Sequence, residues 1–444
     1  MDVDRLNIED TTIKTLGPAK IRSPIRRVEG MGGGACFQPE DSRVLLSIDA
    51  ARVAGEMSEG RQPLGFERAG PRRNIFFDPS KLRAALVTCG GLCPGLNNII
   101  RAIVLELHYG YGVRNIYGIR YGLAGFIPRY GYDVMDLAPR EVADIHGRGG
   151  TILGSSRGPQ DIDEIVDCLE RMNIGILFTI GGDGTLVAST KICDVVQKRG
   201  LNIAVVGIPK TIDNDIYLVE RSFGFDTAVE MATQAIRSAH AEAIGYPNGV
   251  GLVKIMGRHS GFIACHSALA QQDVNFVLIP EVDFDLHGPR GLLAALEERL
   301  RLRSHCVIVV AEGAGQKFFG EQEKRDPSGN IRLHDIGIYL KQQIENHFED
   351  KGWDLNLKYI DPSYMIRSLP ANSNDNVFCS FLARNAVHAG MAGKTRVLVG
   401  YWHNQFVHVP MDASAGKRKQ VTDSPSLWMS VLEATGQSEL SNGK

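Results

Sequence analysis

Short apolar runs that alternate with helical segments are the feature that most constrains how this chain can fold. Ile174–Ile180 and Ile203–Ile208 are apolar almost throughout, which is typical of parallel strands that are covered on both faces. The segment Ile162–Met172, which precedes the first run, carries its apolar residues at helical spacing. This alternation of strand and helix indicates an α/β fold with parallel sheets.

The same alternation continues over most of the chain. The further expected strands are Ala84–Thr88, Val250–Ile255, Val274–Ile279 and Cys306–Ala311. The further expected helices are the stretch after Pro94, Asp226–Ala243, Leu292–Leu302 and the segment 336–348, which follows a polar insert at 320–333 and ends before Gly352. Because 444 residues exceed one ordinary core, we expect two Rossmann-like parallel-sheet domains with helices on both faces.

The first 80 residues differ from the rest of the chain. They lack sustained periodicity and contain glycine clusters such as the one at 31–34. We therefore expect an N-terminal extension that packs on the core.

Composition argues against two classes of partner. The net charge of -2 gives no reason to expect nucleic-acid or membrane binding, and no stretch approaches the roughly 20 apolar residues of a membrane span. The acidic N-terminus lacks the apolar core of a signal peptide. The eight cysteines are scattered, mostly in apolar segments, which favours buried reduced thiols over a zinc site. We therefore expect a cytoplasmic protein.

The first motif, Gly90–Asn97, lies between an expected strand and an expected helix. Its glycines let the backbone approach a bound group, and the N-terminus of the helix favours an anion. A tight structural turn would look the same. The chain has no GxxxxGK[ST] P-loop. It also has no GxGxxG after a strand, which argues against a dinucleotide-dependent dehydrogenase.

The second motif, Gly181–Thr185, places Asp183 between glycines directly after an apolar run. The carboxylate of Asp183 can reach a Mg²⁺ ion that bridges nucleotide phosphates. The glycines remove the Cβ atoms that would block those phosphates. Lipid kinases and NAD kinases carry a segment of this kind as well, so the motif alone leaves the class of kinase open.

The third and fourth motifs, Pro209–Asp215 and Met256–Gly261, supply two acids and an arginine for an acceptor site. Asp213 and Asp215 lie two apart in a loop after a strand, which offers one general base and one metal-binding or orienting group. Phosphoryl transfer needs a base for the acceptor hydroxyl and cations on the phosphates, and Arg258 offers a planar fork for phosphate oxygens. Together the motifs predict a kinase that phosphorylates a sugar phosphate.

These motifs in combination resemble the 6-phosphofructokinase family over about residues 81–410, most closely the longer branch with plant, trypanosomatid and many bacterial members. The resemblance implies transfer of a phosphoryl group from ATP, with Mg²⁺, to the 1-hydroxyl of fructose 6-phosphate, a step of glycolysis. It also implies a homo-oligomer, either a dimer or a tetramer.

The resemblance assigns roles to individual residues. It makes Asp213 the base, with Asp215 and Arg258 as its catalytic partners, and Asp183 the Mg²⁺ ligand. The donor site comprises Gly91, Arg157, Gly182, Asp183, Gly184 and Thr185. The sugar site comprises Thr211, Ile212, Asp213, Met256, Gly257, Arg258, Glu312, Lys358, Tyr364 and Arg367. In the family, the positions of Tyr364 and Arg367 bind the 6-phosphate.

The resemblance also implies a division of the chain into domains. These are an N-terminal extension at 1–80, a phosphate-donor domain at 81–224 with about 366–395, a fructose 6-phosphate domain at 225–365, and a C-terminal segment at 396–444 that packs on the core.

Two positions depart from short bacterial members of the family. Their arginine about seven residues before Met256, which reaches the neighbouring subunit's site, is replaced here by the region around Asn248. A second family arginine is Lys358, which meets phosphate as a point charge without bidentate geometry. The part of the sugar-phosphate site that crosses between subunits is the part that these departures affect.

The phosphate donor depends on Gly184 and Lys210. Pyrophosphate-dependent relatives carry Asp at the Gly184 position, where its bulk and charge exclude the α-phosphate of ATP, and lysine at the Lys210 position. This chain has glycine at the first and lysine at the second. Steric and electrostatic exclusion weighs more, so we expect ATP, with pyrophosphate as the alternative.

Two alternatives from other classes remain. A NAD- or lipid-kinase-like enzyme would share only Gly181–Thr185, and the motifs at Asp213 and Arg258 argue against it. A catalytically silent paralogue that binds sugar phosphate would be expected to lose Asp183 or Asp213, and both are present.

Overall fold

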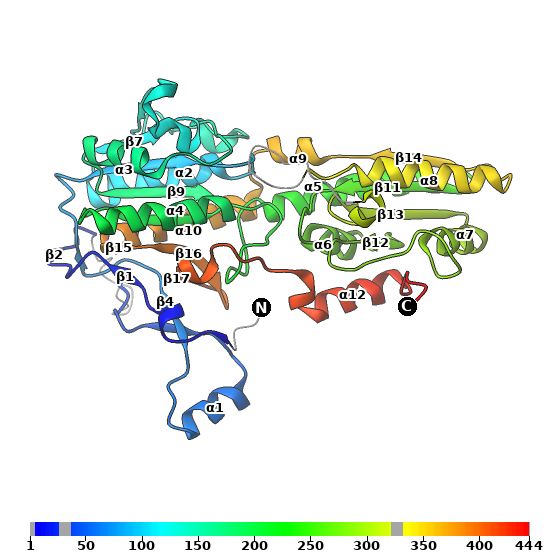
Figure 1. The fold of residues 1–444 in the computed structure, drawn as a ribbon, viewed down its shortest axis with the longest axis horizontal. Helices are drawn as coiled ribbons and strands as arrows, with labels where there is room; N and C mark the ends of the chain where they lie inside the picture. The colour runs from blue at the N-terminus through cyan, green and yellow to red at the C-terminus, as the bar shows by residue number, and fades with distance from the viewer. Residues whose placement is uncertain (1–4, 26–36, 321–331, 444) are drawn as a thin grey trace.

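The computed structural model describes residues 5–25, 37–320 and 332–443. The glycine cluster at 31–34 and most of the expected polar insert at 320–333 lie outside the described residues. Two lobes lie side by side along the long axis of the molecule, each built around one sheet (Figure 1). Within the described ranges no helix has the length and apolar character that a bilayer span requires.

The larger sheet has nine strands in the order β3-β4-β17-β16-β10-β9-β6-β7-β8. Its parallel centre consists of β16 (Val397–Trp402), β10 (Ala204–Pro209), β9 (Ile176–Gly181), β6 (Arg83–Thr88) and β7 (Asn115–Ile119). The outer strands are antiparallel: β3 (Arg43–Leu45), β4 (Gly65–Arg68) and β17 (Gln405–Pro410) at one edge, and β8 (Val134–Asp136) at the other.

Helices cover both faces of this sheet because successive residues of its central strands point to opposite sides. Ala84 and Leu86 pack in one apolar core, while Ala85 and Val87 pack in another. The first core includes α2 (Leu96–Leu105) and α10 (Ser373–Met391), and the second includes α3 (Ile162–Arg171) and α4 (Asp183–Lys198).

The smaller sheet is parallel throughout, in the order β12-β13-β11-β14. Its strands are β11 (Gly249–Ile255), β12 (Phe276–Leu278), β13 (His305–Ala311) and β14 (Asn356–Ile360). The helices α5 (Phe225–Ile244) and α6 (Phe262–Gln271) pack on one face, and α7 (Leu292–Arg303) and α8 (Ile336–Asp350) on the other. Both lobes therefore have the three-layer architecture that the alternating pattern predicts.

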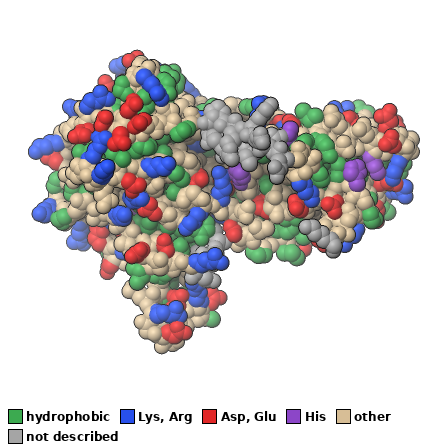
Figure 2. Space-filling view, in the orientation of Figure 1, with side chains coloured by type: hydrophobic (Ala, Val, Ile, Leu, Met, Phe, Trp, Pro, Cys, Tyr) green, Lys and Arg blue, Asp and Glu red, His purple; other side chains and the backbone are tan. Residues whose placement is uncertain are grey.

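The remaining elements join or flank the lobes. They are α1 (Ala50–Ser58), β1 (Lys14–Thr15) paired with β15 (Lys394–Thr395), β2 (Ile21–Arg22) paired with β5 (Asn74–Ile75), α9 (Ser363–Ser368), α11 (Met411–Ser414) and α12 (Pro425–Thr435). The helix α1 projects from the molecule, and the C-terminal segment runs from the larger sheet to α12 beneath the other lobe (Figure 1). Figure 2 shows acidic and basic side chains mixed over the same face, as the small net charge leads us to expect.

The α/β fold class is confirmed, and the predicted strands and helices occur within a few residues of the expected bounds. The segments at the two ends of the chain contribute more than packing. The strands β3 and β4, from the first 80 residues, and β16 and β17, from the last 50, are members of the larger sheet. The strands β3 and β4 have only three and four residues, too few for an apolar period to stand out, whereas β16 is buried almost throughout in the parallel centre of the sheet.

The arrangement of the two sheets positions the candidate site. Gly181 at the end of β9 lies in register with Pro209 at the end of β10, and Thr88 of β6 pairs with Ile180. In the other lobe, Ile255 at the end of β11 pairs with Ala311. All four motifs therefore leave the carboxyl edges of parallel strands, where open α/β sheets bind ligands.

Candidate active site

Two loops form the donor side of the site, and hydrogen bonds hold them together. The side chain of Asn97 donates to the carbonyl oxygen of Arg148 (3.1 Å) and accepts from the amide of Ile152 (2.9 Å). The hydroxyl of Ser155 donates to the carbonyl oxygen of Gly90 (2.6 Å). The Asn97 bonds tie the start of α2 to the loop that carries Arg157.

Gly91 and Arg157 are brought together at this junction. A Cβ atom on Gly91 would lie 3.4 Å from a terminal nitrogen of Arg157. The exposed Arg157 therefore lies beside the Gly91 backbone, where a phosphate could meet both. The ammonium group of the buried Lys210 donates to the carbonyl oxygen of Gly91 (2.9 Å). Burial lowers the pKa of Lys210.

Asp183 is the first residue of α4, with Gly182 as the N-cap. The N-terminus of a helix favours negative charge. The N-terminus of α4 therefore stabilises the Asp183 carboxylate and would also stabilise a bound phosphate. One Asp183 oxygen accepts from the amide of Gly416 (2.6 Å), and the other lies 4.0 Å from Arg418. A Cβ atom on Gly184 would meet nothing within 4 Å, so the space beside Gly184 is open.

Asp213 and Asp215 follow β10 and have different surroundings. One Asp215 oxygen accepts from the hydroxyl of Thr211 (2.7 Å), and the other accepts from Arg418 (3.0 Å). One Asp213 oxygen accepts from the backbone amide of Arg258 (3.3 Å), and the other is buried without a hydrogen-bond partner. Asp215 is thus fully engaged, whereas Asp213 keeps an oxygen that can accept a proton.

The environment of Asp213 raises its pKa to about 7. Burial is the largest cause, because it disfavours the charged form. The negative charges of Asp215 and Glu312 act in the same direction, and the amide of Arg258 and the charge of Arg367 oppose them. A carboxylate with a pKa near the working pH is suited to act as a general base.

The loop after β11 carries the acceptor side of the site toward Asp213. Gly257 has φ +129, and a Cβ atom there would lie 2.6 Å from the carbonyl oxygen of Ser260, so this tight turn requires glycine. Because the chain turns here, the Arg258 amide reaches Asp213. Glu312 follows β13, and its amide donates to the carbonyl oxygen of Ile255 (2.9 Å).

Arg367 lies in α9 and contacts Met256 of the acceptor loop. Its Nε lies 3.3 Å from the sulfur of the buried Met256. The positive charge of Arg367 also influences the pKa values of both Asp213 and Lys210. This contact therefore orients Arg367 toward the acceptor side, where the sequence predicts a phosphate contact.

Thr185 is buried in the first turn of α4, and Ile212 is buried in the loop after β10. Lys358 and Tyr364 are placed differently. Lys358 is exposed in the edge strand β14, paired with Gly251 in β11 and with its ammonium group 5.6 Å from the Tyr246 ring. Tyr364 is 84% exposed. Within one chain, both side chains are therefore exposed, unlike the buried Asp213 carboxyl group.

A third contributor to the site was not predicted. The segment 416–421 lies along the loop that carries Asp215 and supplies Gly416, Arg418 and Lys419. Lys419 donates from its amide to the carbonyl oxygen of Asp215 (2.9 Å) and from its buried ammonium group to the carbonyl oxygens of Val219 and Glu220. The only sequence signal was the basic run after Gly416, and basic runs usually form a solvated surface.

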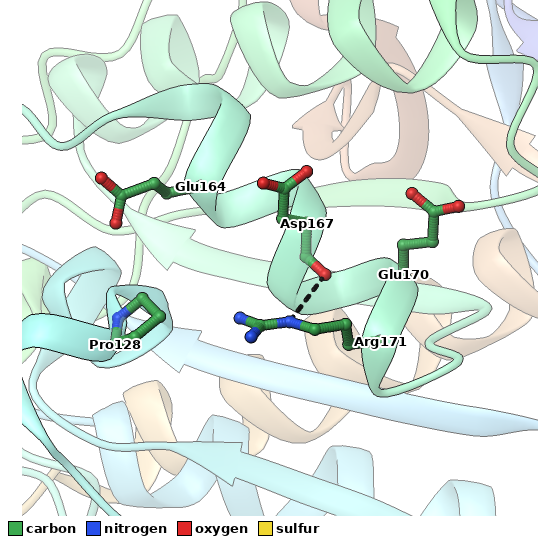
Figure 3. A pocket seen from close by; sticks show the side chains of 5 residues that line it. All are labelled: Pro128, Glu164, Asp167, Glu170 and Arg171. Carbon is green, nitrogen blue, oxygen red and sulfur yellow. Dashed lines mark hydrogen bonds between the residues drawn. The ribbon is translucent and has the colours of Figure 1, made fainter.

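Two surface hollows lie apart from these residues. Figure 3 shows one that is lined by Pro128 and by four residues of α3, namely Glu164, Asp167, Glu170 and Arg171. The other runs along α5 and α6, between Phe225 and Ala270. Neither is lined by a residue of the candidate site, and the acidic lining of the first does not suit a phosphorylated ligand.

Asp183 fits the role of a Mg²⁺ ligand. Among the described residues, no group of three or more His, Cys, Asp or Glu side chains could hold a metal ion. Mg²⁺ that arrives with a nucleotide commonly takes only one or two protein carboxylates, and phosphates and water complete its coordination. Asp183 offers a partly exposed carboxylate next to the open space at Gly184, which matches this arrangement.

Comparison with known proteins identifies the family. A family model described as phosphofructokinase matches residues 83–390. The chain is 49% identical over 435 residues to an ATP-dependent 6-phosphofructokinase of Borreliella burgdorferi, with 96% of this chain and 97% of that protein covered. It is 48% identical over 377 residues to ATP-dependent 6-phosphofructokinase 1 of Arabidopsis thaliana, with 84% and 79% covered. The corresponding enzyme of Trypanosoma cruzi is 43% identical over 388 residues, with 86% and 79% covered.

Solved structures agree on the fold. A pyrophosphate-dependent phosphofructokinase from Marinobacter aquaeolei superposes with a TM-score of 0.64 at 19% identity, covering 76% of this chain and 85% of that one. A phosphofructokinase from Pichia pastoris gives 0.62 at 20% identity, covering 80% and 37%. The resemblance drawn from the motifs, including that to plant and trypanosomatid enzymes, is confirmed, and the chain belongs to the phosphofructokinase family.

Proposed function

We propose that this kinase transfers the γ-phosphoryl group of ATP to the 1-hydroxyl of fructose 6-phosphate, with Asp213 as the general base. The relatives named above, which match 84% to 96% of the chain, support the activity. The observation that carries the assignment of the base is the buried oxygen of Asp213 that has no hydrogen-bond partner, in a carboxylate whose other oxygen accepts from the Arg258 amide of the acceptor loop.

The residues on the acceptor side have different roles in the reaction. The free oxygen of Asp213 takes the proton of the 1-hydroxyl as the sugar oxygen bonds to phosphorus. Asp215, held by Thr211 and Arg418, keeps the loop in place and does not compete for that proton. The Arg258 side chain contributes a positive charge on the acceptor side, while its amide orients Asp213. Arg367 binds the 6-phosphate of the sugar through charge-assisted hydrogen bonds.

On the donor side, Gly91, Arg157 and the segment Gly182–Thr185 bind the phosphates of ATP. Asp183 would hold Mg²⁺, which neutralises charge on the phosphate oxygens when it is bound. The open space at Gly184 favours ATP because it leaves room for an α-phosphate. Pyrophosphate is the second candidate donor, and Lys210 is the observation that favours it.

A coupled assay of the purified protein tests the proposal. Production of fructose 1,6-bisphosphate is measured with fructose 6-phosphate, Mg²⁺ and either ATP or pyrophosphate as donor. We expect turnover with ATP and little with pyrophosphate. A preference for pyrophosphate would overturn the role given to Gly184. Binding of fructose 6-phosphate without turnover from either donor would instead support the catalytically silent paralogue.

The exposed positions of Lys358 and Tyr364 support a homo-oligomer, either a dimer or a tetramer. Both belong to the expected sugar site, yet in one chain they lie at the surface, where a second copy can use them. Light scattering of the purified protein measures the assembly. A monomer that retains full activity would contradict this role for the two residues.

A cytoplasmic location accords with the state of the cysteines. The seven cysteines in the described residues are free thiols, and six of them are buried. Burial raises the pKa of Cys89 and Cys93 to about 12, so these thiols stay protonated and unreactive. Fractionation of the source cells, with detection of the protein in each fraction, tests the location.

A further inference from the structure

Arg418 occupies a position that neither the motifs nor the family comparison assigns. It lies outside the matched residues 83–390, in the segment that connects the larger sheet to α12. One terminal nitrogen lies 3.0 Å from Asp215, and the other lies 4.0 Å from Asp183. A single guanidinium group therefore links the carboxylate expected to hold the donor's metal with the carboxylate beside the general base.

The backbone holds Arg418 in this position. Arg418 forms an antiparallel bridge with Ile216, which directly follows Asp215. On either side of it, the Gly416 amide donates to the carboxylate of Asp183 (2.6 Å) and the Lys419 amide donates to the backbone carbonyl oxygen of Asp215 (2.9 Å). The link between the two carboxylates is thus built into the chain and does not depend on one long side chain finding its partner.

The chemistry of the position explains what a guanidinium group can do there. The transferred phosphoryl group must pass between the donor side, at Asp183, and the acceptor side, at Asp213. Charge spreads over its oxygens during transfer, and fixed cations stabilise that charge. Arg418 can keep one nitrogen on Asp215 and offer the other to a phosphoryl oxygen, since its donors form a rigid planar fork. Its side chain is 36% exposed, so a ligand can reach it.

We propose that Arg418 is a further catalytic residue, which contacts the phosphoryl group while it moves from ATP to the sugar. In this step the bond from the sugar oxygen to the γ-phosphorus forms as the bond from that phosphorus to the bridging oxygen breaks. The electron pair of the broken bond stays with ADP, and the hydroxyl proton passes to Asp213. The proposal rests on the proposed function, because it requires ATP as the donor.

Substitution of Arg418 tests the proposal in kinetics and in binding. We expect Arg418→Met to lower kcat roughly 10³-fold, in the range known for arginines that stabilise phosphoryl transfer, and to leave KM for fructose 6-phosphate within about threefold. In calorimetry, its Kd for Mg²⁺–ADP should equal that of wild type. Its Kd for a non-hydrolysable ATP analogue with Mg²⁺ should rise roughly tenfold or more, because only the analogue has a γ-phosphoryl group.

Two further variants complete the design. Arg418→Lys keeps the charge but lacks the fork, so it should bind Mg²⁺–ADP normally and lose about tenfold in kcat; it also serves if Arg418→Met does not fold. Lys417→Met is the matched control, because the Lys417 ammonium group lies 5.5 Å from the Tyr217 ring and is exposed. It should retain the kcat of wild type.

Three outcomes would overturn the inference. They are wild-type kcat in either Arg418 variant, an equal weakening of Mg²⁺–ADP and of the ATP analogue, and a rise in KM for fructose 6-phosphate with unchanged kcat. The second would show that Arg418 acts through Asp183 alone. The activity of the wild type separates this inference from the proposed function. If the wild type turns over ATP and the Arg418 variants do so equally well, only the inference fails. If the wild type does not turn over ATP, both fail.

Discussion

Asp213 shows how much a single residue of this site depends on its surroundings. Its carboxyl group is buried, has two acidic neighbours, and keeps one oxygen without a partner. Asp215, two residues away, is paired on both oxygens. In the proposed mechanism, two aspartates of the same motif therefore have different roles, one to accept a proton and one to hold the loop.

Removal of the base is the direct test of this residue. We expect Asp213→Ser to lower kcat by roughly 10²–10⁴-fold, the usual contribution of a positioned general base. KM for fructose 6-phosphate should change little, because Arg367 and the fold remain. Steady-state kinetics of the purified variant measure both values. Near-normal turnover would exclude Asp213 from this role.

The raised pKa of Asp213 predicts how activity depends on pH. Only the ionised carboxylate can accept the hydroxyl proton, so kcat should fall as the pH drops through about 7. Asp215→Asn removes one of the charges that raise this pKa. In that variant, the remaining activity should therefore persist to lower pH. Profiles of kcat against pH for the two proteins make the comparison, and coincident acid limbs would contradict the assignment.

Arg367 is the residue on which we expect binding of the sugar phosphate to depend most. Arg367→Ala should raise KM for fructose 6-phosphate roughly 10–150-fold and lower kcat less, since a charge-assisted hydrogen bond contributes about 1.5–3 kcal/mol. Arg367→Lys, which retains the charge, is the control and should lose less. A rise in KM for ATP instead would place Arg367 on the donor side of the site and contradict its assignment to the 6-phosphate.

At the scale of single elements, the site consists of the loops that leave parallel strands. The helix α4 begins at Asp183, one residue after the end of β9, so the proposed metal ligand lies in the first turn beside the N-terminal amides of the helix. The turn at Gly257 directs the amide of Arg258 to Asp213. The elements bring together residues that lie far apart in the chain.

The first turn of α4 determines the phosphate donor in our interpretation. Gly184→Asp should abolish use of ATP, because its carboxylate would crowd and repel the α-phosphate. The substitution should not disturb the fold, because a Cβ atom at this position meets nothing within 4 Å. Assays with ATP and with pyrophosphate measure the outcome. We also expect weak activity with pyrophosphate, because Lys210 is already present, and Gly184→Ala, which adds no charge, is the control.

At the scale of the whole molecule, both ends of the chain complete the larger lobe. Glu67 in β4 is 5% exposed and contacts three basic side chains. It accepts hydrogen bonds from Arg72 and His408, and it pairs with the buried Lys394 at 2.7 Å. This cluster fastens the first 80 residues to β15 and β17, so the N-terminal region is an integral part of the sheet.

Loss of Glu67 should therefore destabilise the molecule. Glu67→Gln leaves buried cations without a counter-charge, which typically costs about 3–5 kcal/mol of the free energy of unfolding. Glu40→Gln is the matched control, because Glu40 meets Arg72 and Lys394 at 3.4 Å but has a side chain that is 70% exposed. Its loss should cost about 1 kcal/mol or less. Denaturation midpoints compare the variants, and equal midpoints would contradict the role of Glu67.

The same cluster predicts a loss of stability in acid. Burial opposes ionisation of Glu67, but the hydrogen bonds and charges of His408 and Lys394 outweigh it, so the pKa of Glu67 is lowered. Because its pKa is lowered in the folded protein, ionised Glu67 stabilises the fold at pH values above about 4.5, its pKa in the unfolded chain. This contribution is lost progressively as the pH falls from about 4.5 toward the lower pKa of the folded state. The difference in midpoint between wild type and Glu67→Gln should therefore shrink in acid.

The sequence by itself determined the α/β class, most of the central strands and helices, and the motifs of the site. Buried parallel strands are apolar on both faces, and the loops after them carry glycines and acids at short spacing, so both signals are local. Only the tertiary structure decided that Arg418 lies between Asp183 and Asp215, that Lys358 and Tyr364 face outward, and that β3, β4, β16 and β17 extend one sheet. The arrangement of the sheet depends on contacts between residues far apart in the chain, such as Trp402 of β16 with Leu45 of β3, which are 357 positions apart. A basic run or a short edge strand has no local pattern that names its distant partner.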